Sequence, residues 1–422
     1  MSVDLEWETA PLSSRLVRID AGHSPDLPDA PAGAGDWGVL KVSAVHKDGF
    51  RPRENKAVGL VSGLIDSRYE VQPGDLLFSR ANTPELVGAS CIAIETPERL
   101  MLSDKTLRLV LDPDAADAHF VNICLSSPSL RRQIGLASSG SSRSMQNISQ
   151  RAIRNFLLKW PTLKVQRRIV EILDAVSESE RAVQAIISKL RTVRGGIALH
   201  GMESIMSSEV PSDWERVALR EVVPSVDYGI SVALDDDSRG VATLRMNNLL
   251  DGRPELGDLR YCPQDVQTKP LLRVGDVLFN RTNSIEHVGK SALWGGEIEK
   301  ATFASYLVRL NPDFARLNPG YLVEWLQHPA IRQRVRSIAT VAVQQVNVNP
   351  GRLRDLLIDF PTDLQKQAEI VASLEVCDRQ ISVERESLAK IRVMKQGISD
   401  ALLNGGMGKL DRLTKAAESG AL

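Results

Sequence analysis

Two segments of the sequence place an arginine and an asparagine two residues apart, directly after a short apolar run. They are Arg80 with Asn82 and Arg281 with Asn283. An arginine side chain can form two hydrogen bonds with guanine, and an asparagine or glutamine side chain can do the same with adenine. These four residues are therefore candidates for contacts with the base edges of DNA.

A structural role for the two arginines is an equally good interpretation. Carboxylates that could pair with them lie nearby in the sequence: Asp75 and Glu85 for the first arginine, and Asp276 and Glu286 for the second. Two half-sites of different sequence would need different side chains, so an arginine that both segments share favours neither role. Asp75 and Asp276 each follow a glycine and precede an apolar run, which is typical of a turn that leads into a strand.

Further candidates lie in loops that differ between otherwise similar parts of the chain. Residues 138–146 and 340–345 contain small hydroxyl residues and glutamine, and the first loop also contains an arginine; this composition is typical of surfaces that follow a phosphate backbone or base edges. Residues 47–56 and 251–261 are the variable loops best suited to sequence specificity. The candidates from these loops and their borders are Arg51, Arg53, Lys56, Ser141, Arg143, Gln146, Arg253, Gln344, Gln345 and Asn347.

The sequence offers little that would support catalysis. Residues 289–291 (GKS) resemble the end of a phosphate-binding loop, but Ser284 stands where that motif needs a glycine. The four cysteines are far apart and the histidines lack metal-ligand spacing, so we expect no metal site. An enzyme with an unrecognised site around Asp75 and Asp276 and a purely structural scaffold remain alternatives.

Length and composition indicate an ordinary globular protein. A chain of 422 residues that is 43% hydrophobic suggests two to three domains of roughly 150 residues each. The longest apolar runs contain only a few residues, far from the roughly 20 that span a bilayer. The N-terminus lacks the pattern of a signal peptide, and scattered thiols fit a reducing compartment. We therefore expect a cytoplasmic protein without contact to a membrane.

The positive charge is concentrated in two zones, although the net charge is only −1. Residues 118–170 and 325–354 contain no aspartate or glutamate, and each zone holds several arginines. Two basic zones on a nearly neutral chain predict two local sites for an anionic partner.

An internal repeat relates these two zones. Residues 74–90 align without a gap to residues 275–291, with ten of seventeen positions identical and an offset of 201. Similar pairs occur along the whole chain, from Trp7 and Trp214 to Asn147 and Asn347. The chain is therefore expected to contain a duplicated domain, with one basic zone in each copy.

Each copy ends in a segment with the period of a long amphipathic helix. Apolar or small residues alternate at spacings of three and four, which predicts a coiled-coil seam. The first stripe is Ile169, Ile172, Val176, Ser179, Val183, Ile186, Leu190, Val193 and Ile197. The second is Ile370, Leu374, Cys377, Ile381, Glu384, Leu388, Ile391, Lys395, Ile398 and Leu402. We expect the two helices to pair with each other; the alternative is that each packs on its own globular half.

The part of each copy before its helix has a mixed pattern. Residues 37–42 and 106–111 are rich in β-formers and predict strands, whereas residues 117–135 predict one or two helices. Strands and helices without regular alternation favour an α+β class. The predicted domains are residues 1–160 and 206–361, followed by spacer helices in residues 161–205 and 362–422.

These features together resemble the specificity subunits of type I restriction–modification systems. The resemblance covers nearly the whole chain. It is based on the two-copy layout, the tryptophan near the start of each copy, the GDxLFxR segments at 74–80 and 275–281, and the helix junctions at 161–174 and 361–375. In the junctions, Gln166, Leu173, Gln367 and Leu374 fit the family pattern, whereas Thr162 and Thr362 replace a proline.

The resemblance implies two similar target-recognition domains related by a pseudo-twofold axis and separated by a long antiparallel two-helix coiled coil. It implies a bipartite, asymmetric double-stranded DNA target, no catalysis by this chain, and no cofactor bound to it. Two adenine-methyltransferase subunits using S-adenosylmethionine, and restriction or translocase subunits using ATP and Mg, are implied as partners. The alternative is a stand-alone DNA-binding or antirestriction protein of the same fold.

Overall fold

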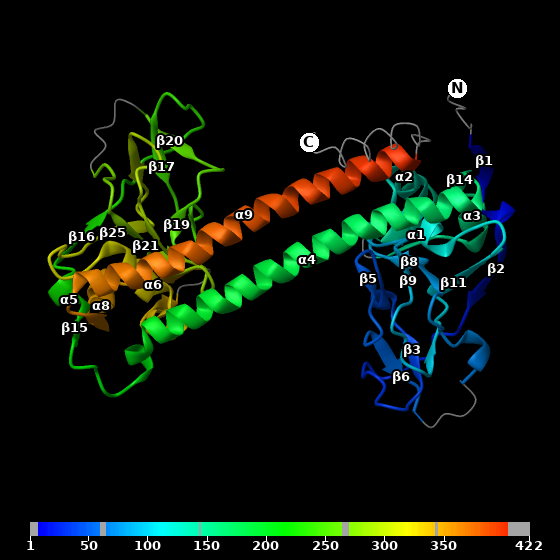
Figure 1. The fold of residues 1–422 in the computed structure, drawn as a ribbon, viewed down its shortest axis with the longest axis horizontal. Helices are drawn as coiled ribbons and strands as arrows, with labels where there is room; N and C mark the ends of the chain where they lie inside the picture. The colour runs from blue at the N-terminus through cyan, green and yellow to red at the C-terminus, as the bar shows by residue number, and fades with distance from the viewer. Residues whose placement is uncertain (1–6, 60–64, 143–144, 264–269, 342–344, 404–422) are drawn as a thin grey trace. The chain divides into compact units, whose positions relative to one another are not determined.

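The computed structural model describes residues 7–59, 65–142, 145–263, 270–341 and 345–403. The chain divides into two compact units, of which unit 1 comprises Met1–Val183 with Ser387–Leu422 and unit 2 comprises Gln184–Glu386. Each unit contains one domain of strands and short helices, together with part of each of two long helices, α4 (Leu163–Gly201) and α9 (Leu364–Leu403) (Figure 1).

The domain of unit 1 is built around a four-stranded antiparallel sheet. The sheet has the order β2 (Leu16–Ala21), β11 (Thr106–Leu111), β7 (Leu76–Ser79) and β9 (Ser90–Ile92). The smaller strand groups are β10 (Leu100–Met101) with β3 (Gly38–Leu40) and β6 (Asn55–Ala57), β12 (Ser139–Ser142) with β13 (Met145–Asn147) and β8 (Ala81–Asn82), β1 (Glu8–Pro11) with β14 (Leu157–Trp160), and β4 (Val45–His46) with β5 (Gly49–Phe50). The short helices are α1 (Ala118–Ser126), α2 (Pro128–Ala137) and α3 (Gln150–Arg154).

The domain of unit 2 repeats this topology. Its four-stranded sheet has the order β16 (Ser225–Tyr228), β25 (Leu307–Asn311), β21 (Val277–Asn280) and β23 (Ser291–Leu293). The smaller groups are β20 (Arg260–Cys262) with β17 (Val241–Leu244) and β24 (Ala301–Phe303), β22 (Thr282–Asn283) with β27 (Val346–Asn347) and β26 (Thr340–Val341), β15 (Trp214–Ala218) with β28 (Leu357–Pro361), and β18 (Leu249–Leu250) with β19 (Arg253–Pro254). The short helices are α5 (Leu219–Val222), α6 (Pro319–Gln327), α7 (Pro329–Ser337) and α8 (Pro350–Leu353).

The secondary structure agrees with most of the elements expected from the sequence. The strand predicted at 106–111 is β11, and the strand predicted at 37–42 is shorter, Gly38–Leu40. The helical segment expected at 117–135 forms two helices. The break falls at Ser127, whose side chain accepts a hydrogen bond from the N–H of Leu130, because Pro128 can begin a helix but cannot continue one.

A buried glutamine joins each long helix to the domain that precedes it. Gln166 in α4 is fully buried; its Oε1 accepts from the N–H of Asp117 (2.9 Å), and its Nε2 donates to the carbonyls of Ala115 (3.1 Å) and Pro161 (3.0 Å). Gln367 in α9 makes the same three bonds, with the N–H of Asn318 and the carbonyls of Arg316 and Pro361. A single amide thus connects the first turn of each long helix to the segment before α1 or α6.

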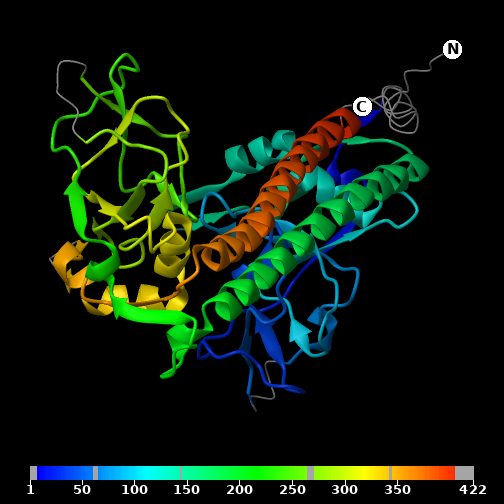
Figure 2. The same ribbon diagram turned by 60° about the vertical axis from the view of Figure 1, so that its left-hand side comes forward.

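The two long helices pair in each unit and run in opposite directions (Figure 2). In unit 1, the core cluster that contains Ile169 and Leu173 near the start of α4 also contains Leu402 at the end of α9. Farther along α4, Glu180 binds Arg392 (2.8 Å) and Lys395 (3.1 Å), which precede Leu402. In unit 2, Arg194 binds Asp378 (2.6 Å), and Gly201 lies against Ile370.

The predicted seam is confirmed for α9 and half wrong for α4. All ten predicted α9 positions are buried or half-buried. In α4, the positions at 169, 176, 183, 190 and 197 face inward, but the alternate positions are one residue later than predicted. Leu173 and Ile187 are 5% and 6% exposed, whereas the predicted Ile186 and Val193 are 44% and 45% exposed.

The shift in α4 has a clear physical cause. The other two inward-facing positions of α4 are Glu180 and Arg194. Glu180 meets a cation of α9, and Arg194 meets a carboxylate of α9. Hydrogen bonding to Arg392 lowers the pKa of Glu180. A search for apolar residues at heptad spacing passes over such charged seam positions and selects their apolar neighbours instead.

We predict that Gln166→Met and Gln367→Met each lower the free energy of unfolding by about 3 kcal/mol, because each leaves one N–H and two carbonyls in a buried or half-buried place without a partner. Urea unfolding measures this change. The exposed Gln184 in α4 provides a matched control, and Gln184→Met should alter stability by less than about 0.5 kcal/mol. Losses as small as the control's for both buried positions would show that the glutamines do not hold the junctions.

Candidate nucleic-acid interface

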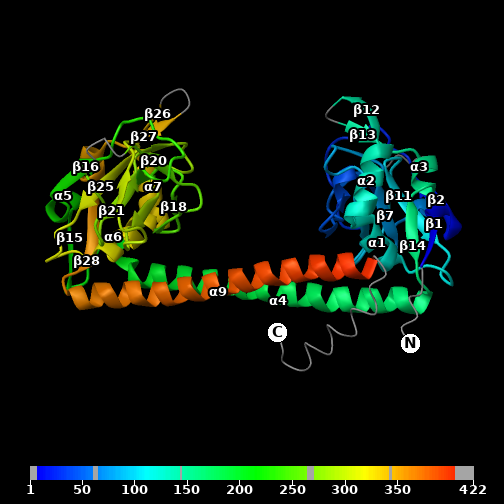
Figure 3. The ribbon, with the colours of Figure 1, turned by 90° about the horizontal axis from the view of Figure 1, so that it is seen from above.

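A small three-stranded sheet brings the first group of candidate DNA-binding residues together. In β8 and β13, Asn82 pairs with Gln146 and Ala81 with Asn147, so residues more than sixty positions apart in the sequence become neighbours. Ser141 belongs to β12 of the same sheet. The β12–β13 hairpin lies at the end of the domain farthest from α4 (Figure 3).

Unit 2 forms the counterpart from β22, β27 and β26. Thr282 pairs with Asn347, and Asn283 pairs with Val346, which brings Asn347 next to Arg281. Gln345 is exposed and directly precedes β27. This hairpin also lies at the end of its domain farthest from the long helices (Figure 3).

Arg281 has two side-chain contacts without a counterpart at Arg80 in the described part of the chain. Its guanidinium carbon lies 5.4 Å from the centre of the Tyr228 ring, and its Nη2 donates to Oδ1 of Asn347 (3.3 Å). Ala21, in β2, occupies the strand position in unit 1 that Tyr228 occupies in unit 2. The two units thus place the same arginine in different surroundings.

Two of the four carboxylates proposed as structural partners of these arginines, Asp75 and Asp276, bind other residues. Arg108 bridges Asp75 (2.9 Å) and Asp20 (2.9 Å) in unit 1. In unit 2, Arg309 bridges Asp276 (2.7 Å) and Asp227 (2.6 Å) in the same way. The ion-pair interpretation for Asp75 and Asp276 is therefore wrong. The Nε atoms of Arg80 and Arg281 are buried and have no hydrogen-bond partner in the described part of the chain.

The turn interpretation of the two aspartates is confirmed. Oδ2 of Asp75 accepts a hydrogen bond from the N–H of Gln72, and Oδ2 of Asp276 accepts one from the N–H of Arg273, both at 2.9 Å. Each carboxylate therefore closes the turn before its strand and joins the ionic bridge across the sheet. This double structural role accounts for the occurrence of the aspartate in both copies.

The paired asparagines also stabilise turns. Oδ1 of Asn82 accepts from the N–H of Thr83 (2.9 Å), and Oδ1 of Asn283 accepts from the N–H of Ser284 (2.8 Å). Asn82 is only 9% exposed. The arginine, rather than the asparagine, is therefore the better candidate within each pair.

The remaining candidates do not all join these sheets. Arg51 and Arg53 are exposed between β5 and β6, Arg51 lies 3.0 Å from Nδ1 of His46, and Lys56 is half-buried in β6. Lys56 is thus part of the β10-β3-β6 sheet, and Arg51 and Arg53 precede its strand β6 in the sequence.

Arg253 is exposed in β19, next to a turn that faces a long helix. Its neighbour Asp251 pairs with Arg385 of α9 at 3.7 Å. Arg143, Gln344 and the side chain of Ser141 lie outside the described residues. A role of any candidate in DNA binding stays a prediction.

Some arginines of the predicted basic zones stabilise the fold. Nη1 of Arg131 donates to the carbonyl of Val87 (2.8 Å), and Nη2 of Arg332 donates to the carbonyl of Glu286 (3.1 Å). Burial lowers the pKa of both arginines. Both side chains hold the turn that follows β8 or β22, so counting basic residues overestimates the charge available to a partner.

We predict that Arg131→Met and Arg332→Met each lower the free energy of unfolding by about 1–3 kcal/mol, because each leaves a turn carbonyl without its donor. The neighbouring Arg132 and Arg336 are exposed, so Arg132→Met and Arg336→Met should change stability by less than about 0.5 kcal/mol. Urea denaturation separates the two pairs. Equal effects in both pairs would mean that the buried arginines do not hold the turns.

Comparison with known proteins connects this architecture to one family. No family model matches the chain. The chain is 33% identical over 169 residues to the type I restriction enzyme EcoEI specificity subunit of Escherichia coli, an alignment that covers 40% of this chain and 28% of that protein. It is 27% identical over 203 residues to the putative type I restriction enzyme MjaX specificity subunit of Methanocaldococcus jannaschii, covering 47% of each. The chain thus spans less than half the length of both relatives.

A third relative aligns over more of its length. The type I restriction enzyme EcoBI specificity subunit of Escherichia coli is 22% identical over 369 residues, which cover 80% of this chain and 74% of that protein. The chain resembles type I specificity subunits. The similarity expected from the repeated motifs and the helix junctions is thereby confirmed.

Two solved structures have a fold similar to that of this chain. A chain from a study of complex assembly and conformational transition of the type I R-M system matches with a TM-score of 0.58 and 18% identity, covering 96% of this chain and 100% of that one. The S subunit of a type I restriction–modification system from M. genitalium matches with a TM-score of 0.57 and 12% identity, covering 96% and 97%. None of the helices in the described residues has both the length and the apolar character needed to cross a membrane.

Proposed function

We propose that this chain is the DNA-specificity subunit of a type I restriction–modification complex. The observation that supports this most directly is the repeated domain, in which the same topology presents a three-stranded hairpin sheet twice with different side chains. Asn82 pairs with Gln146 in one copy, whereas Asn283 pairs with Val346 in the other, and Ala81 is replaced by Thr282. Two similar domains with different surfaces suit a bipartite and asymmetric DNA target.

The long helices set the spacing between the two half-sites in this proposal. α4 and α9 contain 39 and 40 residues, which at 1.5 Å per residue correspond to roughly 60 Å of helix. Each begins at a buried glutamine that joins it to one domain, and the seam residues pair in opposite directions within each unit. A coiled coil of this kind is stiff enough to act as a spacer.

Other subunits supply the chemistry in this proposal. Two adenine-methyltransferase subunits bring S-adenosylmethionine, and restriction or translocase subunits bring ATP and Mg, in the cytoplasm. α9 offers a surface for such partners, since Val376, Val383 and Met394 are 57%, 58% and 49% exposed. Their spacings of seven and eleven residues place them on one face of the helix.

An antirestriction protein of the same fold is the alternative. Such a mimic of DNA would need an acidic surface where the specificity subunit binds DNA. The zones 118–170 and 325–354, which contain no acidic residue, favour DNA binding over DNA mimicry.

We predict that Arg281→Ala weakens binding of the assembled methyltransferase to its target and relaxes specificity in one half-site only. A lost base contact costs about 1–3 kcal/mol and acts at one position, whereas a lost phosphate contact weakens binding to all sequences alike. Competition binding with a panel of mutated targets separates these outcomes. Gln345→Ala should affect the same half-site, and Arg80→Ala the other one. Parental affinity and salt dependence in all three variants would remove these sheets from the DNA interface.

The spacer role can be tested by lengthening both helices. Insertion of seven residues after Val183 in α4 and before Ser387 in α9 keeps the seam in phase. It adds roughly 10 Å of helix, or up to about three base pairs of B-DNA at 3.4 Å per step. Mapping of methylated sites should then find the original two half-sites with a longer gap between them.

A stably folded variant that methylates the original spacing would contradict the spacer role. Recognition of a single undivided target by the parental complex would contradict the bipartite proposal itself. As a control, insertion of three residues in α4 alone should break the pairing of the helices and lower stability.

A further inference from the structure

The last residue of β16 places an aromatic ring on the guanidinium of Arg281. Tyr228 pairs with Val308 of β25, and Val308 pairs with Phe279 of β21, two residues before Arg281. The guanidinium carbon lies 5.4 Å from the centre of the Tyr228 ring, within the range of a cation–π interaction. The ring is 53% exposed, so burial in the core does not account for its position.

A glycine fixes the main chain directly after this ring. A Cβ atom on Gly229 would collide with the carbonyl of Ala304, so only a glycine allows the chain to pass so close to that carbonyl. Gly22 has the same role after β2 of unit 1, where a Cβ atom would also collide with a main-chain carbonyl. The two copies thus keep the glycine and differ in the residue before it, which is Ala21 in unit 1 and Tyr228 in unit 2.

The side chain of Arg281 is held by two further neutral groups. Nη1 donates to the carbonyl of Ser305 (3.4 Å), and Nη2 donates to Oδ1 of Asn347 (3.3 Å). Nε is buried, so a ligand cannot reach it from outside. Each Nη carries two N–H bonds, so one N–H bond on each Nη remains for a ligand.

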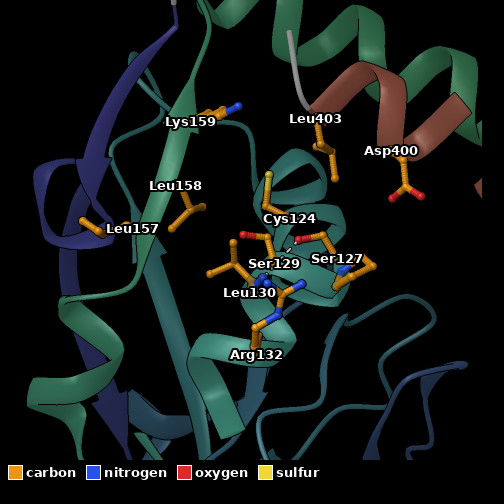
Figure 4. A pocket seen from close by; sticks show the side chains of 11 residues that line it. Cys124, Ser127, Ser129, Leu130, Arg132, Leu157, Leu158, Lys159, Asp400 and Leu403 are labelled. Atoms are coloured by element: carbon orange, nitrogen blue, oxygen red, sulfur yellow. Dashed lines mark hydrogen bonds between the residues drawn. The ribbon is translucent and has the colours of Figure 1, made fainter. Parts of the chain in front are cut away.

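A hollow in unit 1 contains cations in a different setting. The hollow measures about 430 Å³, and Arg132 and Lys159 share its lining with Asp400 (Figure 4). That lining carries charges of both signs and therefore favours no single class of ligand. Within the described part of the chain, the groups that contact the side chain of Arg281 are all neutral, so no carboxylate compensates its charge there.

We propose that Tyr228 is a positioning residue that holds the Arg281 guanidinium for a guanine in the half-site of unit 2. This inference rests on the proposed function, because it takes the sheet next to Arg281 as part of the DNA interface. The two remaining N–H bonds lie on neighbouring nitrogens and suit the N7 and O6 acceptors of guanine. The ring and Asn347 limit the rotation of a long side chain, so less conformational freedom is lost on binding. In unit 1, Ala21 provides no ring for Arg80.

Competition binding of the assembled methyltransferase tests this role, with each G·C pair of its mapped target replaced in turn by A·T. At one pair, the parental complex should discriminate against the replacement by at least about fivefold, and Arg281→Ala should remove this discrimination. Tyr228→Leu should reduce it about two- to fivefold, as expected for one cation–π contact at an exposed site. Tyr228→Phe should retain it, because the ring still lies on the guanidinium.

Two controls separate positioning from a general loss of structure. Tyr306 is also exposed, at 44%, and Tyr306→Leu should leave the discrimination unchanged. In the Arg281→Ala background, Tyr228→Leu should have no further effect on discrimination, since the ring acts through the arginine. Discrimination in the other half-site should stay at the parental level in every variant, which shows that the complex is folded and assembled.

Three results would contradict the positioning role. Unchanged discrimination in Tyr228→Leu, together with relaxed discrimination in Arg281→Ala, would overturn this role and leave the proposed function in place. Weaker binding of Tyr228→Leu to all sequences alike would also overturn it, because the ring would then act on the DNA backbone or on the fold. Unchanged discrimination in Arg281→Ala would remove this arginine from the DNA interface, and the inference with it.

Discussion

The attachment of each long helix to its domain depends on one buried side-chain amide. Gln166 and Gln367 are each fully buried and each satisfy an N–H and two carbonyls of the preceding domain. A glutamine suits this position because its amide supplies both an acceptor and two donors at the end of a short flexible stem. An unpaired amide in this environment would be costly, so the bonds fix the direction in which the helix leaves the domain. Any use of the helices as a spacer requires that this angle be constant.

The two copies keep their framework and differ at their outer ends. Arg108 with two aspartates in unit 1, and Arg309 with two aspartates in unit 2, form the same bridge across the central sheet. The hairpin sheets retain the backbone pairing but change the neighbours of the shared arginine. A framework fixed by partly buried ionic bridges allows surface residues to change without loss of the fold. This separation explains how a single domain, once duplicated, can acquire two different outer surfaces.

The sequence predicted the architecture better than it predicted the site. The duplication, the two helices after residue 117 and the whole α9 seam could be found because they depend on repetition and on apolar periodicity. The α4 seam was shifted at alternate positions, since Glu180 and Arg194 face inward and only their ion-pair partners on α9 explain this. The role of Arg131 and the ion-pair partner of Asp75 could not be predicted either. Their partners, the carbonyl of Val87 and the guanidinium of Arg108, are brought near by tertiary structure that no local pattern contains.

Arg194 shows why the charged seam positions matter. Its guanidinium joins α4 to Asp378 of α9 and to Glu324 of α6, at 2.6 and 2.8 Å. Burial raises the pKa of Glu324, so this carboxylate gains a great deal from a cation held directly beside it. Sliding α9 by one heptad in one direction would place Arg194 opposite Arg385, and in the other direction opposite Val371. Both shifts leave Asp378 without its cation and Arg194 without one of its carboxylates, and breaking such a pair lowers stability. A seam of heptad-spaced apolar residues alone would carry no such penalty for a shift by one heptad.

The ion pairs in the two halves of the seam have opposite orientation. In unit 1, an acidic residue on α4 meets cations on α9, whereas in unit 2 a cation on α4 meets acidic residues on α9 and α6. Apolar seams built from leucine and isoleucine tolerate several registers, and polar groups at single positions select one of them. The ionic pairs therefore contribute specificity of alignment rather than much stability. For a pair of helices whose length is to define a distance, a single allowed alignment is the more important property.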